Sequence, residues 1–186
     1  MFDSSYQGLK RALEKEKQIY LSPSLKQRIL DRIKHTQKTQ MWKFVKAMRY
    51  TAYFKAKNKR SIIGVLLGLF WQRRMNVLGE RIGMFMDYNT FDEGATFYHP
   101  TVYACGNIGK NCRLHGNNMI GRNSLGGTDV PTIGDNVRFC YGAQAFGDIY
   151  IADDVTIAAG SIVLKSCYEK GVTLAGVPAK IIKRPE

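Results

Sequence analysis

The chain has 186 residues, 45% of them hydrophobic, which is enough to build one sizeable domain with an appendage and excludes wholesale disorder. The formal net charge of +13 is unevenly distributed. Residues 1–81 hold 19 Lys and Arg against 5 Asp and Glu, a net +14, whereas residues 82–186 hold 9 against 10, a net −1. We therefore predict a basic N-terminal segment (1–81) joined to a near-neutral C-terminal domain (82–186).

The N-terminal segment has the sequence pattern of helices. Residues 5–20 place Leu9, Leu13 and Ile19 on one side. Pro23 ends this helix, and Ser22 and Ser24 are candidate caps for a second helix over 24–38, whose apolar stripe is Leu25, Ile29 and Ile33. Residues 41–80 mix aromatic and basic residues without a proline, so we predict more helix there.

Two further features of the chain predict its compartment. The four cysteines form no C-x-x-C pair, so we expect neither zinc nor disulfides, and we expect the thiols to be reduced and mostly buried: Cys105, Cys112, Cys140 and Cys167. The N-terminus has no apolar core of a signal peptide, and the longest apolar run, Ile62 to Trp71, is about half of a membrane-spanning length. A cytoplasmic protein is expected.

From about residue 82 a period of six residues appears. Large apolar residues recur at Val102, Ile108, Leu114 and Ile120, and then at Ile133, Phe139, Ala145, Ile151, Ile157 and Val163. A period of six fits neither one long helix nor an ordinary strand, but it fits a short strand and a turn repeated many times. The large residue would point inward and Gly, Asn or Asp would form the turn, so stacked units would bury a continuous apolar column.

The repeat is interrupted once, in the segment from Arg122 to Pro131. Ile120 and Ile133 are 13 residues apart, which is two repeats and one extra residue. A loop that breaks a regular solenoid is a frequent place for function, and the alternative is a neutral surface insertion.

Two motifs resemble those of known enzymes. The tail from Thr173 to Ile182 contains Ala-Gly-Val-Pro-Ala-Lys and resembles the terminal motif of hexapeptide-repeat O-acetyltransferases. The stretch from Arg49 to Ile120 is similar to serine-acetyltransferase-like enzymes encoded with capsule and exopolysaccharide genes. The matching residues are Tyr53-Phe54-Lys55, Asn89 to Gly94, His99, and Ile108 to Gly116. The resemblance covers about residues 45–184.

The resemblance implies a mainly β protein, a left-handed parallel β-helix with an N-terminal α-helical segment. It also implies a homotrimer with active sites between neighbouring subunits. Acetyl-CoA would be the donor, and no metal is expected.

Transfer of an acetyl group to a hydroxyl needs a base, stabilisation of the oxyanion and alignment of both substrates, but no covalent enzyme intermediate. A histidine is the residue type to seek. His99 aligns with the catalytic histidine of the family, and His115 is the other candidate. A carboxylate usually orients such a base, and Asp87 and Asp92 precede His99. Each of these four residues also has an ordinary structural role as its alternative.

Small residues and cations are the candidates for CoA binding. A pantetheine arm needs a narrow groove, and small residues occur at Gly126, Gly127, Ala143, Ala158, Ala159 and Gly176. The phosphates need cations, and Lys165, Lys180, Lys183 and Arg184 cluster late in the chain. Glycine and alanine that merely permit tight coil packing are the alternative.

The acceptor is expected to be a sugar hydroxyl of a cell-surface polysaccharide or its precursor. Serine acetyltransferases carry Arg-His before the proline of the loop, where this chain has Asp129-Val130 before Pro131, which argues against free serine. Serine O-acetylation and N-acetylation of an amino sugar remain alternatives on the same scaffold. A non-catalytic β-helix is an alternative of another class.

The basic N-terminal segment has three interpretations. It caps the end of the solenoid, it contacts anionic lipid through residues 41–60, where aromatic and basic residues interleave, or it binds an acidic polymer. No recognised nucleic-acid-binding module is present, so no nucleic-acid partner is expected.

Overall fold

The structure, a computed structural model, describes residues 2–57, 61–123 and 128–185. The chain divides into two compact units, Phe2–Met84 and Phe85–Glu186. This division lies three residues beyond the boundary predicted at 81. We describe each unit by itself.

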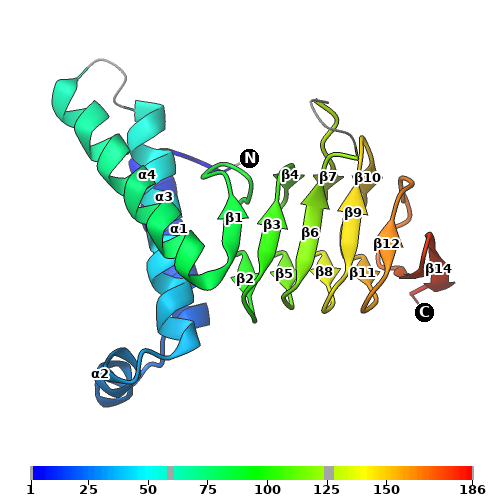
Figure 1. Cartoon of the computed structure of the whole chain (residues 1–186), viewed down its shortest axis with the longest axis horizontal. Helices are drawn as coiled ribbons and strands as arrows, with labels where there is room; N and C mark the ends of the chain where they lie inside the picture. The colour runs from blue at the N-terminus through cyan, green and yellow to red at the C-terminus, as the bar shows by residue number, and fades with distance from the viewer. Residues whose placement is uncertain (1, 58–60, 124–127, 186) are drawn as a thin grey trace. The chain divides into compact units, whose positions relative to one another are not determined.

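The first unit contains four helices within its described residues, α1 (Tyr6–Tyr20), α2 (Leu25–Ile33), α3 (Gln37–Lys57) and α4 (Ile62–Ile82) (Figure 1). The first predicted helix is confirmed, whereas the second ends earlier than 38 and the third segment forms two helices. Ser24 caps α2, because its Oγ accepts a hydrogen bond from the backbone N–H of Gln27 at 3.4 Å. Gly83, at a φ of 66°, ends α4 in the left-handed conformation that favours glycine.

The apolar stripe predicted for α2 is not part of the core. Leu25, Ile29 and Ile33 are all exposed, and α2 has no buried residue. In α1 the buried face is also shifted from the prediction, because Ala12 and Glu16 are completely buried whereas Ile19 is exposed. Periodicity identified both helices but not the surface that each of them buries.

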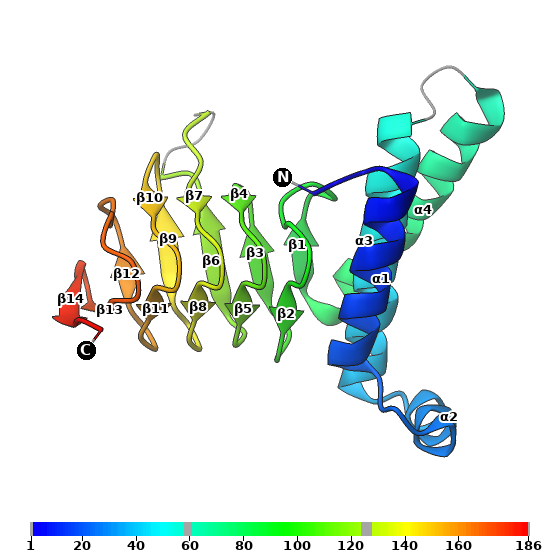
Figure 2. The ribbon, with the colours of Figure 1, turned by 180° about the vertical axis from the view of Figure 1, so that it is seen from behind.

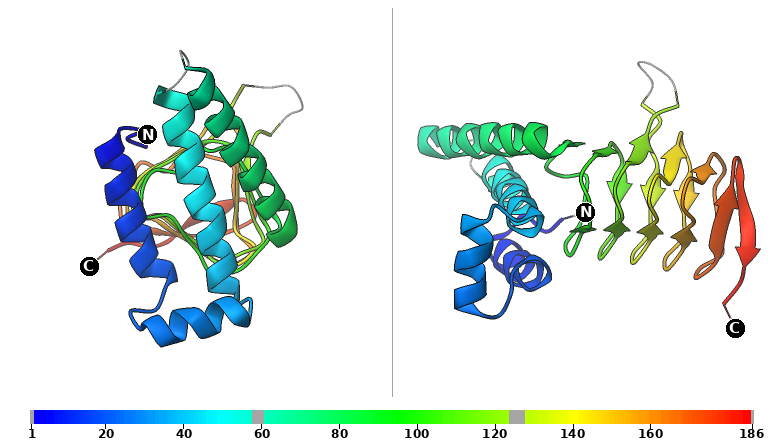
Figure 3. Two further views of the ribbon diagram at one scale, coloured as in Figure 1. Left: turned by 90° about the vertical axis from the view of Figure 1, so that its left-hand side faces the viewer. Right: turned by 60° about the horizontal axis from the view of Figure 1, so that its bottom comes forward.

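Packing between α1 and α3 includes a buried ion pair. The Arg49 guanidinium donates to both carboxylate oxygens of Glu16, with Nη2 2.6 Å from Oε1 and Nε 3.1 Å from Oε2, and both side chains are 0% exposed. The Arg49 guanidinium also lies 4.6 Å from the centre of the Phe2 ring. Helices α1, α3 and α4 lie side by side in Figure 3. Because the ion pair is completely buried, removing either Glu16 or Arg49 would leave the other side chain charged in a dry interior.

The lipid-facing surface predicted at residues 41–60 is mostly inside the helical unit. Phe44 is 1% exposed, and Met41, Val45 and Met48 are buried with it. Large apolar residues are exposed instead on α2 and in the first half of α4, from Ile62 to Phe70. Among the described residues, no helix has the length and apolarity needed to cross a membrane.

The second unit is a parallel β-helix with three sheets, which we name A, B and C. Each coil contributes one short strand to each sheet in that order, and the coils stack side by side (Figures 1 and 2). Sheet A contains β1 (Met84–Met86), β3 (Val102–Ala104), β6 (Asn118–Gly121), β9 (Gln144–Phe146) and β12 (Ile162–Val163).

Sheet B contains β4 (Asn107–Ile108), β7 (Thr132–Ile133) and β10 (Tyr150–Ile151), and single bridges at Phe91 and Cys167 extend it at both ends. Sheet C contains β2 (Thr96–Phe97), β5 (Arg113–Leu114), β8 (Arg138–Phe139), β11 (Thr156–Ile157) and β13 (Thr173–Gly176). The last strand, β14 (Ala179–Lys183), pairs antiparallel with β13.

The period-six positions form the core, as the sequence predicted. All ten, from Val102 to Val163, are at most 3% exposed. They stack in register from coil to coil, for example Leu114 on Phe139 and Phe139 on Ile157. The interior is therefore a set of columns in which each large residue is covered by its counterparts in the adjacent coils.

Asparagine and aspartate form a ladder at the turn before sheet C. Asn111, Asn136 and Asp154 all have left-handed φ values, of 56°, 59° and 62°. The Asn111 amide donates to Asn136 Oδ1 at 2.9 Å, and the Asn136 amide donates to Asp154 Oδ1 at 3.0 Å. The turn residues predicted from sequence thus also join the coils.

Candidate active site

The two candidate histidines lie at one corner of the β-helix, where the chain turns from sheet C to sheet A. We call this the C–A corner. His99 follows β2 and His115 follows β5, its neighbour in the sheet. The Tyr98 N–H donates to the Leu114 carbonyl at 2.9 Å, which places Tyr98 beside His115, with ring centres 4.7 Å apart. Strand register therefore brings together residues that are 16 positions apart in the sequence.

Close approach at this corner requires a glycine. A Cβ on Gly116 would lie 2.6 Å from the Cβ of His99, and Gly116 has a φ of 103°. Only glycine fits both the space and the backbone conformation without a shift. Gly116 thus lets His99 lie directly against the following coil.

His115 is half-buried and His99 is exposed. Partial burial, followed by the charges of Arg138, His99 and Arg113, lowers the pKa of His115 below its ordinary value. A lowered pKa keeps the imidazole neutral at pH 7, which is the form that accepts a proton or a hydrogen bond. The corner therefore has one histidine open to a ligand and one that remains uncharged beside it.

A buried amide supports the backbone of the corner. Asn118 is 2% exposed, and its Oδ1 accepts a hydrogen bond from the Gly116 N–H at 2.9 Å. Its Nδ2 donates to the carbonyls of Cys140 at 2.8 Å and Ala143 at 3.0 Å. Because every polar atom of this side chain is paired, it holds two coils together directly behind the histidines. Sequence reasoning missed Asn118, although a polar residue beginning a buried strand was a usable signal.

The small residues predicted for CoA follow the same corner into later coils. Ala158 and Ala159 follow β11, and Gly176 ends β13. The Ala158 N–H donates to Leu174 at 2.8 Å, and the Gly176 N–H donates to Ser161 Oγ at 3.1 Å. Like the two histidines they lie along the C–A corner, and the coil between them contributes the exposed Tyr141.

Ala143 lies at this corner but is 0% exposed, so its methyl group packs inside the coil and cannot line a groove. Gly126 and Gly127 lie outside the described residues. The glycine and alanine candidates thus have different environments, and the exposed ones are Ala159 and Gly176, with Ala158 half-buried.

The lysine candidates are also divided. Lys180 in β14 pairs with Ala175, the residue after Leu174, and is exposed beside the corner. Lys183 pairs with Thr173, further along the outer face of sheet C. Lys165 follows β12 and lies at the turn from sheet A to sheet B, which is a different corner. Tertiary structure therefore separates Lys165 from the small residues with which sequence proximity had grouped it.

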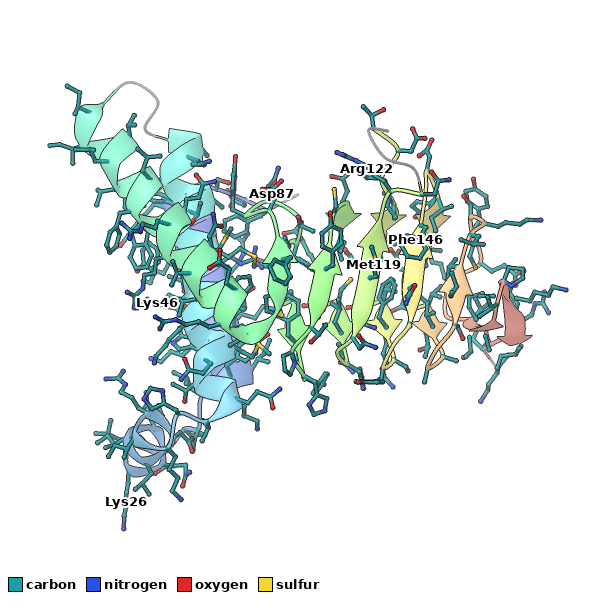
Figure 4. All side chains as sticks on the ribbon, in the orientation of Figure 1. Lys26, Lys46, Asp87, Met119, Arg122 and Phe146 are labelled. Atoms are coloured by element: carbon teal, nitrogen blue, oxygen red, sulfur yellow. The ribbon has the colours of Figure 1, made fainter. Side chains whose placement is uncertain are left out.

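Neither candidate carboxylate lies at the C–A corner. Asp87 is exposed where the chain leaves sheet A (Figure 4), and among the described residues its side chain has no hydrogen bond. Asp92 is 7% exposed beside Phe91, where the chain leaves sheet B, and its Oδ1 accepts from the Glu93 N–H at 2.8 Å. Within the described part of the chain, no hydrogen bond joins either carboxylate to His99.

Two arginines beside the corner were missed by sequence reasoning. Arg113 and Arg138 precede Leu114 and Phe139, pair with each other across β5 and β8, and are exposed on the outer face of sheet C. Among the described residues, neither guanidinium has a salt bridge. Like charges in directly paired positions repel each other, so this site favours an anion. The signal was available, because both arginines occupy outward positions of the period-six repeat.

The remaining polar groups do not suggest a metal or a nucleophile. Within residues 2–57, 61–123 and 128–185, no group of three or more His, Cys, Asp or Glu has the geometry of a metal site. All four cysteines are free, and two of them, Cys112 and Cys167, are buried. Burial raises the pKa of the Cys112 thiol to about 12, which keeps it protonated and unreactive.

Relatives of known function share part of this sequence. Serine acetyltransferase of Staphylococcus xylosus is 39% identical over 84 residues, which cover 41% of this chain and 38% of the relative. Serine acetyltransferase of Staphylococcus aureus strain Mu50 is 38% identical over 84 residues, which cover 39% of that protein. The chain thus spans about two fifths of the length of the curated relatives that it matches. No protein-family model matches the chain.

Solved structures extend the likeness to nearly the whole chain. Serine acetyltransferase of Brucella abortus strain S19, in complex with coenzyme A, aligns with a TM-score of 0.68 at 21% identity, covering 95% of this chain and 68% of that one. Serine acetyltransferase of Neisseria gonorrhoeae aligns with a TM-score of 0.69 at 21% identity, covering 97% and 68%.

The chain is similar to serine acetyltransferases.

This similarity confirms the resemblance to serine acetyltransferases, over 84 residues in sequence and over nearly the whole chain in fold, whereas the association with capsule and exopolysaccharide genes stays a prediction. It also confirms the predicted fold class, a left-handed parallel β-helix with an N-terminal helical segment. Identities near 21% establish the fold alone, so the activity of serine acetyltransferases reaches this chain as a proposal.

Proposed function

We propose that the protein is an acetyl-CoA-dependent O-acetyltransferase that transfers an acetyl group to a hydroxyl of a small acceptor. The observation that carries this proposal is the C–A corner, where His99 and His115 adjoin in neighbouring coils and exposed small residues follow in the later coils. The sequence and fold similarity to serine acetyltransferases supports the same chemistry.

In the proposed mechanism the neutral imidazole of His99 accepts the proton of the acceptor hydroxyl as its oxygen attacks the thioester carbonyl. The new ester C–O bond forms, the C–S bond breaks, and the proton passes from His99 to the departing thiolate. His115 stays neutral and lies beside His99, where it orients the acceptor or shares the proton. Acetyl-CoA supplies an acyl group that is already activated, so no serine or cysteine nucleophile is needed.

The residues along the corner fit an extended pantetheine arm. Ala158, Ala159 and Gly176 leave space beside the backbone, and Lys180 is an exposed cation at the same edge, suited to a CoA phosphate. We propose these four residues as the donor-binding side of the site. Lys183 remains a candidate further along sheet C, whereas Lys165 would need a different subunit to reach the same donor.

For the acceptor we propose a sugar hydroxyl of a cell-surface polysaccharide or its precursor that also carries an anionic group. Arg113 and Arg138 support this choice, because they are adjacent exposed cations next to His115. A phosphate or a sugar carboxylate would pair with them. The names of the relatives favour serine as the second candidate acceptor, and its carboxylate would suit the same arginines.

We propose a homotrimer with active sites between subunits. The outer face of sheet A supports this, because it exposes a row of large apolar residues, Phe85, Tyr103 and Met119, and Phe146 lies beside it (Figure 4). An apolar row of this kind suits burial against a second copy. The C–A corner borders that face, so a neighbouring subunit there would complete the cleft.

A cytoplasmic location is proposed as well, since four free cysteines suit a reducing compartment.

The test is release of free thiol from acetyl-CoA in the presence of separate acceptor pools, namely serine, nucleotide-linked sugars and amino sugars. We expect acceptor-dependent release with nucleotide-linked sugars, and His99→Ala is expected to lower kcat about 10²- to 10⁴-fold. His35→Ala is the matched control, because His35 is exposed in the helical unit.

Arg113→Gln/Arg138→Gln is expected to raise KM for the anionic acceptor about tenfold or more while kcat changes little.

Each other outcome selects a different function. Release only with serine would establish the serine O-acetyltransferase, and release only with amino sugars would establish N-acetyl transfer. Loss of activity in His115→Ala but not in His99→Ala would move the base to His115. No release with any pool, together with no binding of CoA, would identify a non-catalytic β-helix.

A further inference from the structure

The first half of α4 exposes its large aliphatic side chains. Ile62, Ile63, Leu66 and Phe70 are 81%, 70%, 60% and 56% exposed. In this half only Gly64 and Gly68 are buried. The exposed residues are contiguous and form a larger apolar surface than scattered surface leucines would.

The packing of this half against α3 uses small residues. Gly64 and Gly68 are four positions apart, and a Cβ on Gly68 would lie 3.7 Å from Lys55 Cγ and 3.9 Å from Phe54 Cβ. Small residues at i and i+4 let two helices approach closely and leave the large side chains pointing outward. This arrangement is common where the surroundings are lipid and the apolar side chains need no burial inside the protein.

Beside this surface lies an open groove of about 910 Å³ formed by residues of α1 to α4 and their connections. Its walls are apolar and basic, and no Asp or Glu is found among the described residues that line it. The cations that line it are Lys17, Arg28, Arg32, Lys43, Lys46 and Arg74. Its apolar lining includes Leu25, Ile29, Phe70 and Trp71, so the otherwise unburied stripe of α2 faces the groove.

One polar atom of the groove wall has no partner. Arg28 Nε is buried and has no hydrogen bond within the described residues, although Nη2 of the same guanidinium donates to the Pro23 carbonyl at 3.3 Å. A buried N–H of a guanidinium without an acceptor is costly, and an anionic oxygen in the groove would satisfy it.

Aromatic rings lie between the apolar and the basic residues. Trp71 follows Phe70 directly and stacks on Tyr50, with ring centres 4.4 Å apart, and Lys46 Nζ lies 5.8 Å from the centre of the Tyr50 ring (Figure 4 labels Lys46). Along α4 the order is aliphatic residues, then Trp71, then Arg73 and Arg74. The same order of apolar, aromatic and basic groups is found across the boundary of a bilayer.

We propose that the helical unit docks on an anionic phospholipid surface. Lipid phosphates occupy the basic groove, and the aliphatic side chains of Ile62 to Phe70 enter the boundary between headgroups and acyl chains. The proposal does not depend on the acetyltransferase activity, because every residue it uses lies in the first unit. It narrows the lipid contact predicted at residues 41–60 to those that line the groove, Trp42, Lys43 and Lys46, and adds the first half of α4.

Charge favours lipid over a second copy of the chain. Whatever the symmetry of an assembly, a second copy offers this groove no strongly acidic unit, because residues 82–186 carry a net charge of only −1. Residues 1–81 hold only 5 Asp and Glu against 19 Lys and Arg, so the helical unit offers few anions to neutralise them. Anionic headgroups supply that charge and the apolar layer together.

The experiment is co-sedimentation of the full chain with vesicles of phosphatidylglycerol and phosphatidylcholine, compared with phosphatidylcholine alone. We expect binding to the anionic vesicles that weakens with salt. Arg32→Gln/Arg74→Gln removes two exposed cations of the groove and is expected to lower the partition coefficient about fivefold per cation. Lys10→Gln/Lys26→Gln is the matched control, because it removes the same charge from exposed positions that do not line the groove.

A second pair of variants tests the apolar contact. Ile63→Gln/Leu66→Gln replaces two exposed residues, so the fold is expected to persist, and the partition coefficient should fall about tenfold per residue. Tyr168→Gln, at a residue 76% exposed in the β-helix, is the control. Sedimentation velocity of wild type and Ile63→Gln/Leu66→Gln should give the same oligomeric state.

Three results would overturn the proposal. They are absence of binding to anionic vesicles, equal losses in the groove variant and the Lys10/Lys26 control, and dissociation of an oligomer by Ile63→Gln/Leu66→Gln. The last would mean that a second copy covers this surface. Binding of inorganic phosphate without binding of vesicles would likewise replace lipid with a soluble anion.

Discussion

At the period-six positions of the β-helix the large apolar residues point inward, whereas in the first half of α4 the large aliphatic residues point outward. Leu114 and Ile157 are completely buried by adjacent coils, but Ile63 and Leu66 are more than half exposed. The charge differs in parallel, with −1 in residues 82–186 and +14 in residues 1–81. The repeat of the β-helix thus buries its large residues between coils, whereas the first half of α4 leaves them exposed beside a helical core formed by residues such as Phe44 and Met48.

The largest expected effect separates these two kinds of apolar residue. Phe139→Ala should destabilise the β-helix by about 3–5 kcal/mol, because it leaves a cavity in a closed column. Leu66→Ala should change the free energy of unfolding by less than about 0.5 kcal/mol, since that side chain is exposed. Denaturant titration measures both. Equal losses would mean that the first half of α4 is buried in solution.

A similar loss is expected at the buried ion pair of the helical unit. Arg49→Ala should cost about 3–5 kcal/mol, because it leaves the Glu16 carboxylate uncompensated in a dry interior. Glu16→Leu/Arg49→Met, which removes both charges and restores apolar volume, should be more stable than the single variant. If the double variant is the less stable of the two, the pair contributes net stability and the dry-interior explanation fails.

A smaller effect distinguishes two glycines at the C–A corner. Gly116→Ala and Gly160→Ala both place alanine at a positive φ, which costs roughly 1–2 kcal/mol. Only at Gly116 would the new Cβ also meet His99, at 2.6 Å, whereas at Gly160 nothing lies within 4 Å. We expect Gly116→Ala to be the less stable variant and also to lose activity. Thermal unfolding and the thiol-release assay measure the two effects, and equal stabilities would contradict the contact with His99.

The smallest effect is the pH dependence from His115. Its pKa is lowered in the folded state, so the unfolded chain binds more protons just below the ordinary value of 6.5. Stability from this residue is therefore fully present above about pH 6.5 and declines as the pH falls toward the folded pKa. The difference in the free energy of unfolding between pH 7.5 and pH 5.5 should be slightly smaller in His115→Gln than in wild type. An unchanged slope would mean that partial burial and the neighbouring charges of Arg138, His99 and Arg113 do not lower this pKa.

Much of the candidate site was recognisable from residue types, but its geometry was not. His99 and His115 were identified as candidates, and the structure places them at one corner. Lys165 was grouped with Lys180 because both are late in the chain, yet they lie at different corners. Arg113 and Arg138 were missed because they are 25 residues apart in sequence and adjacent only through the pairing of β5 and β8.

For the helices, the sequence pattern predicted where they lie in the chain but not how they pack. Their positions followed from periodicity and caps, but their buried faces did not, because a helix can direct an apolar stripe to a core, to a groove or to a membrane. Leu25 and Ile29 were predicted to form an apolar stripe, and the structure shows that they line a basic groove. The partner of such a stripe depends on the other helices, which the local pattern does not encode.

The period of six residues was sufficient to predict stacked short strands and turns, since each repeat specifies its own inward residue and turn through local chemistry, whereas the left-handed β-helix was implied by the resemblance to hexapeptide-repeat enzymes. The difference in net charge between the two regions likewise followed from their composition alone. Only the tertiary structure decided which residues share a corner, because that depends on coil lengths and strand register summed over many residues. Stacking of the coils places His99, His115 and Gly116 together, and packing of the helices leaves the first half of α4 exposed.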